Sequence, residues 1–160
     1  MAQSMRHACC ARADTFSWGS WMNAHLESLS RRFAPPLINL RDGRIADDYG
    51  EQESAKIVIN HQLPADVTDE ELDYYQDVWA FLDAPSLLFY FHPVTNWLSR
   101  HPDTDSILFD YYVWSLDRNW PAAMALISDQ DAGAIVAHLI SIKERHHLHE
   151  TYSQCSELFA

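Results

Sequence analysis

Histidines near the end of the chain are the residues best suited to bind a metal ion. His138, His146 and His149 lie on or beside one face of a predicted helix. A zinc site requires three or four ligands in fixed geometry, so a distant residue such as His92 or His101 would have to join them. Their spacing matches no zinc pattern, and the one Glu-x-x-His motif lacks the second copy that a di-iron site needs. We therefore predict no metal and no cofactor, and keep a metal-binding regulator or enzyme that uses this helix as an alternative.

Nucleophilic and phosphate-binding chemistry has little support in the sequence. The three cysteines, Cys9, Cys10 and Cys155, all lie near the chain ends, where a preorganised site is hard to support. The chain has no G-x-S-x-G motif and none of the Gly-rich loops that bind nucleotides. We therefore predict no catalytic residue. Three cysteines cannot form a closed set of disulfides, which favours a reducing compartment and a cytoplasmic location.

Acidic residues are the most informative feature. Glu70, Asp73 and Asp77 follow the spacing i, i+3, i+7 on a predicted helix, with no basic residue between them. Like charges at this spacing oppose helix stability. Asp103 and Asp105 continue the acidic pattern on another segment. These five acids are either a solvated face or, as we predict, a surface that binds a basic protein partner.

The distribution of charge supports a basic partner. The net charge is -12; residues 1–50 carry six bases and five acids, whereas residues 51–160 carry five bases and 18 acids. The longer part therefore has a net charge of -13, which repels nucleic acid and anionic membranes. We predict neither nucleic acid nor membrane as a partner. The same acidity also promotes solubility, which is the simpler explanation.

The elements that must position these residues are mostly helices. Apolar residues recur at helical spacing from Phe16 to Phe33, and Thr68-Asp69-Glu70-Glu71 is a capping box that begins a helix. Pro121 suits a helix start, and Ser128 to Asp131 can cap a final long helix. The segment Leu87–Leu98 could be a buried strand or a helix kinked at a proline, and we prefer the helix because its neighbours are helical.

Two short segments favour a small β element near residues 38–60. The sequence from Ile38 to Ile45 contains Asp42-Gly43, a dipeptide typical of a two-residue hairpin turn. Lys56–Ile59 is rich in β-branched residues, which favour strands.

Length and composition indicate one domain. The chain has 160 residues and is 48% hydrophobic, enough to bury a core. We predict a mainly α protein with a single compact helical domain at residues 15–150, a flexible N-terminus at 1–14 and a C-terminal tail at 151–160. There is no signal peptide pattern, and the longest apolar run, Leu87–Phe91, is too short to cross a membrane.

Residues 51–150 resemble bacterial immunity proteins, the cytoplasmic antidotes to secreted toxins. The likeness rests on small size, one acidic domain, aromatic-rich helical layers and the lack of a catalytic signature; this class shares no motif, so no residue role is carried over. The segment from Val78 to Pro93 also resembles small uncharacterised bacterial domains, which implies no activity. The resemblance implies a non-catalytic protein that neutralises a basic toxin by stoichiometric binding. A structural homodimer that buries surplus aromatic residues is a further alternative.

Overall fold

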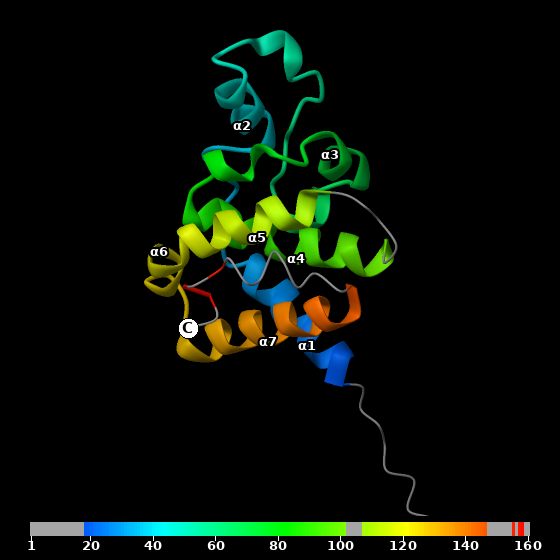
Figure 1. Ribbon diagram of the computed structural model, residues 1–160, viewed down its shortest axis with the longest axis vertical. Helices are drawn as coiled ribbons and strands as arrows, with labels where there is room; N and C mark the ends of the chain where they lie inside the picture. The colour runs from blue at the N-terminus through cyan, green and yellow to red at the C-terminus, as the bar shows by residue number, and fades with distance from the viewer. Residues whose placement is uncertain (1–17, 102–106, 147–154, 156, 159–160) are drawn as a thin grey trace, which may run out of the picture.

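A computed structural model describes residues 18–101, 107–146, 155 and 157–158, and these residues are mainly helical (Figure 1). The prediction of a mainly α fold is confirmed. The described part of the chain contains seven α-helices and three short 3-10 helices (η): α1 (Trp18–Ser30), α2 (Leu40–Asp47), η1 (Gln52–Ser54), η2 (Pro64–Asp66), α3 (Asp69–Tyr74), η3 (Val78–Phe81), α4 (Ala84–Arg100), α5 (Leu108–Arg118), α6 (Trp120–Met124) and α7 (Asp129–His146).

The helices are stacked along the long axis of the molecule. In Figure 1, α2 and α3 lie at one end, α4 and α5 cross the middle, and α1 and α7 lie below them. Aromatic side chains fill the contact between η3, α4 and α5. The Trp79 ring meets Tyr90 and Tyr112 edge to face, with ring centroids 5.6 and 5.1 Å apart, an arrangement that aromatic pairs prefer. These three rings are fully buried and belong to the core.

Helix α4 is the central element, and it confirms the helical interpretation of Leu87–Leu98. Pro93 lies inside this helix, where it removes one backbone donor and disturbs the hydrogen-bond ladder. The Ser30 hydroxyl donates to the carbonyl of Leu88 at 3.0 Å and accepts from the N–H of His92 at 3.1 Å. An undisturbed helix would join these two backbone groups to each other. Ser30, at the end of α1, is thus hydrogen-bonded to the backbone of α4 next to the proline.

The predicted hairpin at Ile38–Ile45 is wrong, because this segment forms helix α2. The Asn39 side chain accepts from the N–H of Asp42, and the Asp42 carboxylate accepts from the N–H of Asn39, both at 3.1 Å. This capping box begins a helix. Gly43 is a helical residue packed against η3, since a Cβ atom at this position would lie 3.0 Å from Cβ of Val78. The glycine is therefore needed for close packing and not for a turn.

The predicted strand at Lys56–Ile59 is also wrong, since no strand occurs among the described residues. The other predicted helix starts are confirmed. Thr68 and Glu71 form a reciprocal cap on α3, Pro121 lies in the first turn of α6, and Ser128 and Asp131 cap α7. Within the described ranges, no helix is both long enough and apolar enough to cross a membrane.

Candidate functional site

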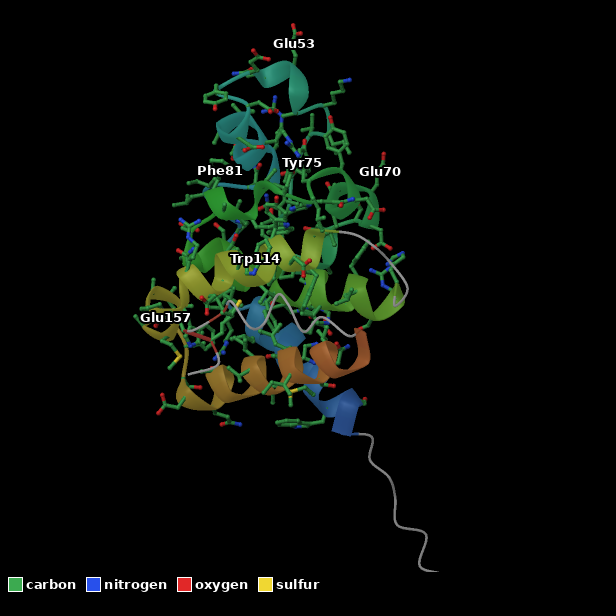
Figure 2. The ribbon with its side chains drawn as sticks, viewed as in Figure 1. Glu53, Glu70, Tyr75, Phe81, Trp114 and Glu157 are labelled. Atoms are coloured by element: carbon green, nitrogen blue, oxygen red, sulfur yellow. The ribbon has the colours of Figure 1, made fainter. Side chains whose placement is uncertain are left out.

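The candidate site is a shallow groove beside α3, where two of the predicted acids lie. Ile57, Glu70, Asp73 and Tyr74 line this groove, which has a volume of about 480 Å³. We call it the α3 groove. Tyr74 is 37% exposed, and the neighbouring Val58 is 77% exposed. Figure 2 shows Glu70 projecting from the edge of the molecule, whereas Tyr75 lies inside it.

The charge of the α3 groove is not compensated within the described structure. The ion pairs among the described residues include neither Glu70 nor Asp73. Their neighbour Asp69 differs, because it forms a two-pronged pair with Arg100, at 2.6 and 2.7 Å. The groove therefore presents two carboxylates beside exposed apolar and aromatic surface.

Glu71 holds α3 in place from the inner side. It is buried, with 8% exposure, and its Oε2 atom accepts from the backbone N–H of Thr68 at 2.7 Å and from the Thr68 hydroxyl at 2.9 Å. The same oxygen lies 3.0 Å from Nε2 of His61. Burial alone would raise the pKa of Glu71, but the hydrogen bonds from His61 and Thr68 outweigh it and lower this pKa. Glu71 is therefore ionised at neutral pH.

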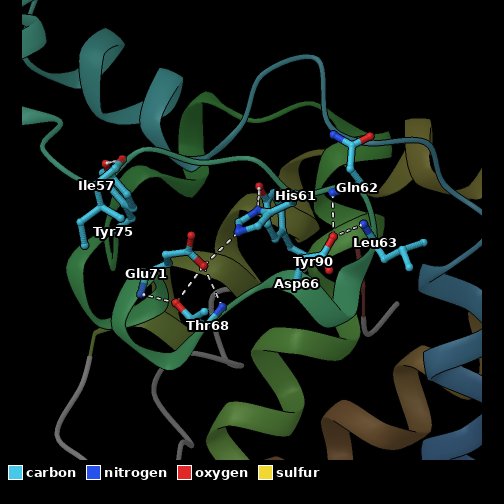
Figure 3. A network of polar contacts seen from close by, with 9 residues as sticks. All are labelled: Ile57, His61, Gln62, Leu63, Asp66, Thr68, Glu71, Tyr75 and Tyr90. Atoms are coloured by element: carbon cyan, nitrogen blue, oxygen red, sulfur yellow. Dashed lines mark hydrogen bonds and ion pairs between the residues drawn. The ribbon is translucent and has the colours of Figure 1, made fainter.

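His61 joins α3 to the central helix (Figure 3). Its Nε2 atom faces Glu71, and its Nδ1 atom lies 3.0 Å from the hydroxyl of Tyr90 on α4. The His61 side chain is 3% exposed. Burial raises the pKa of Tyr90 well above its ordinary value, so the phenol stays neutral. This buried chain of polar groups is satisfied at each step, and such networks make the surrounding structure rigid.

A second contact fixes the other wall of the α3 groove. The Tyr75 hydroxyl donates to the carbonyl of Ile57 at 2.6 Å, and the Tyr74 ring packs edge to face on Tyr75 with centroids 4.8 Å apart. The segment that carries Ile57 and Val58 is therefore tied to α3, and Figure 3 shows this contact beside the His61 network. The two walls of the α3 groove, helix α3 and the segment with Ile57 and Val58, are therefore held together in the unbound protein.

Asp77 does not share a stripe with Glu70 and Asp73, so this part of the sequence prediction is wrong. Helix α3 ends at Tyr74, and a residue beyond the helix end no longer follows its i, i+7 spacing. Asp77 instead forms an ion pair with Arg44 of α2. Asp103 and Asp105, the other two predicted acids, lie outside the described residues.

The histidine-rich end of the chain can be followed only in part. The described residues contain no group of three or more His, Cys, Asp or Glu able to hold a metal ion. His138 packs edge to face on Phe91 of α4, with centroids 6.2 Å apart. The His146 side chain and the whole of His149 lie outside the described part. The prediction that this helix binds no metal therefore stays a prediction.

Sequence reasoning missed His61 altogether. The only clue in the sequence was indirect. The pattern Thr68-x-x-Glu71 predicts a helix cap, but a cap uses only some of the hydrogen-bond acceptor positions of the glutamate. A buried carboxylate needs further hydrogen-bond donors, and His61 is one of them. A search of the sequence for such a donor would still have had several histidines to choose from.

No protein family, curated protein or solved structure matches this chain. What it does is therefore inferred from the chemistry of its own residues.

Proposed function

We propose that this chain is a non-catalytic binding protein that neutralises a basic bacterial toxin domain by stoichiometric binding through the α3 groove. The observation that carries the proposal is the pairing of two uncompensated carboxylates, Glu70 and Asp73, with the partly exposed ring of Tyr74 in one groove. Tyrosine is frequent among the residues that dominate binding energy at interfaces, and acids around it favour a basic partner.

The rigid support of the groove fits this role. Glu71, His61 and Tyr75 hold both walls by buried and partly buried hydrogen bonds, so little ordering of the main chain has to accompany binding. Preorganised surfaces lose less free energy on association than mobile ones. The net charge of -12 adds long-range attraction for a basic partner, which raises its association rate.

The test begins with the partner. Under this proposal, the gene directly upstream encodes a large secreted protein that ends in a basic toxin domain, and that purified domain is the probe. We expect a one-to-one complex that abolishes the activity of the toxin. A purified toxin domain that forms no complex with this chain would contradict the proposal.

Charge reversal then tests the α3 groove. In the double variant Glu70→Lys/Asp73→Lys, association should be at least about tenfold slower and depend less on salt concentration, because steering charges act mainly on the association rate. The matched control is Glu53→Lys/Glu157→Lys, whose acids are exposed; Figure 2 shows Glu53 at the tip of the molecule and Glu157 on the side opposite Glu70. Each reversal adds two charges, so both double variants go from -12 to -8.

The control variant distinguishes a contact at the α3 groove from an effect of the overall net charge. Circular dichroism must show both double variants folded. If the two variants slow association equally, the overall charge acts and the α3 groove is not the contact. If neither slows it, the acidic surface has no part in binding.

A further inference from the structure

A second cleft lies on the other side of α3, between α1, α4 and the segment from η2 to α3. It has a volume of about 310 Å³, enough for a small molecule or one side chain. Its apolar lining comes from Pro64, Val67, Leu72 and Pro93. We call it the α4 cleft. Polar side chains form the larger part of the remaining wall, so a ligand would find both apolar contacts and hydrogen-bond partners.

One face of α4 supplies polar groups to this cleft. His92, Asn96 and Arg100 all line it, and their spacing of four residues places them on one helix face. Arg100 is already engaged with Asp69 at the edge of the cleft. Asn96 differs, because its side chain forms no hydrogen bond with the described residues.

His92 carries an unsatisfied nitrogen next to the cleft. Its Nε2 atom is closed to solvent and has no hydrogen-bond partner, which costs free energy and requires an explanation. Burial lowers the pKa of His92, although the carboxylate of Glu27 opposes this effect. The imidazole is therefore neutral at neutral pH, and one of its nitrogens is a hydrogen-bond acceptor.

The two acids of the cleft are each paired with an arginine, but one carboxylate keeps an unused oxygen. Asp69 pairs with Arg100 and Glu27 pairs with Arg31. Glu27 uses Oε1 to accept from Arg31 at 2.6 Å, which leaves Oε2 available to a ligand. The cleft thus offers two acceptors, a Glu27 oxygen and the Asn96 amide oxygen, and a turn of the His92 ring would add a nitrogen as the third.

We propose that the α4 cleft binds a primary ammonium group carried on a short apolar chain. An ammonium has three N–H donors and no acceptor, which matches the three acceptors, and the apolar chain would contact the proline, valine and leucine side chains. The His92 ring has to turn about its Cβ–Cγ bond for its shielded nitrogen to reach the ligand. The group can come from a free amine or from a lysine side chain. This site is separate from the α3 groove and does not depend on the function proposed for it.

The test is an NMR titration of the 15N-labelled full chain with n-butylamine, and with n-butanol as the neutral probe of the same shape. We expect saturable shifts at the backbone amides of His92 and Asn96 with a Kd on the order of 1 mM, typical of so small a ligand. The His92 ring nitrogens should shift as one of them accepts a hydrogen bond. n-Butanol should bind at least about tenfold more weakly. Equal shifts from both probes, or no saturable shift from n-butylamine, would overturn the proposal.

Two variants identify the groups involved. Glu27→Gln should weaken n-butylamine about tenfold, whereas Glu70→Gln, which changes the net charge equally at the α3 groove, should leave it unchanged. Asn96→Leu should also weaken it, with folding checked by circular dichroism. Equal weakening by the two glutamine variants would show attraction by the overall field only, and would contradict a site at the α4 cleft.

The source of the ammonium is decided by a third probe, Nα-acetyl-lysine N-methylamide. Tighter binding than n-butylamine assigns the cleft to a lysine side chain of a peptide. Weaker binding assigns it to a free amine.

Discussion

Replacing Glu71 by glutamine should destabilise the protein by about 2 kcal/mol. Three hydrogen bonds end on one oxygen of this carboxylate, from the N–H of Thr68, the hydroxyl of Thr68 and the ring of His61. Hydrogen bonds to a charged acceptor contribute about 1.5 kcal/mol each, and neutral ones roughly half of that. Each of the three hydrogen bonds therefore loses about 0.7 kcal/mol when the acceptor becomes neutral, which gives about 2 kcal/mol in total. In a chain of 160 residues this lowers the melting temperature by about 4–8 °C.

The pH dependence of this loss has a definite sign. The pKa of Glu71 is lowered in the folded state, so its contribution to stability is fully present above the pKa of the unfolded glutamate. It disappears as the pH falls through the folded pKa. The difference between wild type and Glu71→Gln should therefore be constant near pH 7 and shrink below about pH 4.3, the unperturbed value.

Urea denaturation followed by circular dichroism, repeated between pH 3 and pH 7, measures both effects. Glu70→Gln is the matched control, because it removes the same charge from the neighbouring residue on the exposed side of α3. It should change the free energy of unfolding by less than about 0.5 kcal/mol. If Glu71→Gln loses no more than this control, or loses the same amount at pH 3 and pH 7, then the buried network does not stabilise the α3 groove as we describe.

Two further predictions test the packing. Gly43→Ala should destabilise the protein by about 1 kcal/mol in urea denaturation, because its Cβ would lie 3.0 Å from the side chain and 3.1 Å from the carbonyl of Val78, and overpacking outweighs the gain in helix propensity. Gly133→Ala in α7 should instead stabilise it by about 0.5–1 kcal/mol, since outside the adjacent backbone of α7 no atom lies within 4 Å of the new Cβ. If both substitutions changed stability in the same direction, the tight packing of Gly43 against Val78 would be refuted. Burial raises the pKa of Cys155 to about 12, so iodoacetamide at pH 8 should modify it about a thousandfold more slowly in the folded protein than in urea. This is measured by mass spectrometry on a chain whose other two cysteines are serine, and rapid modification of the folded chain would show that the thiol is not buried.

The amino-acid sequence by itself determined the helices that begin with a cap formed by residues close together in the chain. Thr68 with Glu71, and Ser128 with Asp131, form caps from residues three apart, and such short-range hydrogen bonds need no other part of the fold. The helix over Leu87–Leu98 was also predictable, because a long apolar segment between helical neighbours is better accommodated as a buried helix. The overall acidity, and its position after residue 50, needed no structure at all.

Tertiary structure decided what local preference left open. Asp42-Gly43 is compatible with a turn or with a helix interior, and the close contact between Gly43 and Val78 of η3 accompanies the helix. Likewise, the spacing of Glu70, Asp73 and Asp77 suits one long helix, but the chain leaves α3 at Tyr74, and Asp77 pairs with Arg44, which lies 33 residues earlier.

The candidate site shows the same division. The sequence pointed to Glu70, Asp73 and Asp77 alike, since no base lies between them along the chain, and only the fold shows that Asp77 is paired with Arg44. The groove that makes the first two of these acids useful depends on Ile57 and Tyr74 meeting across a fold, and on His61 joining Glu71 to Tyr90, which lie 10 and 29 residues away from it. Such contacts arise only when burial of the apolar core brings distant segments together, so no pattern of spacing along the chain could have predicted them.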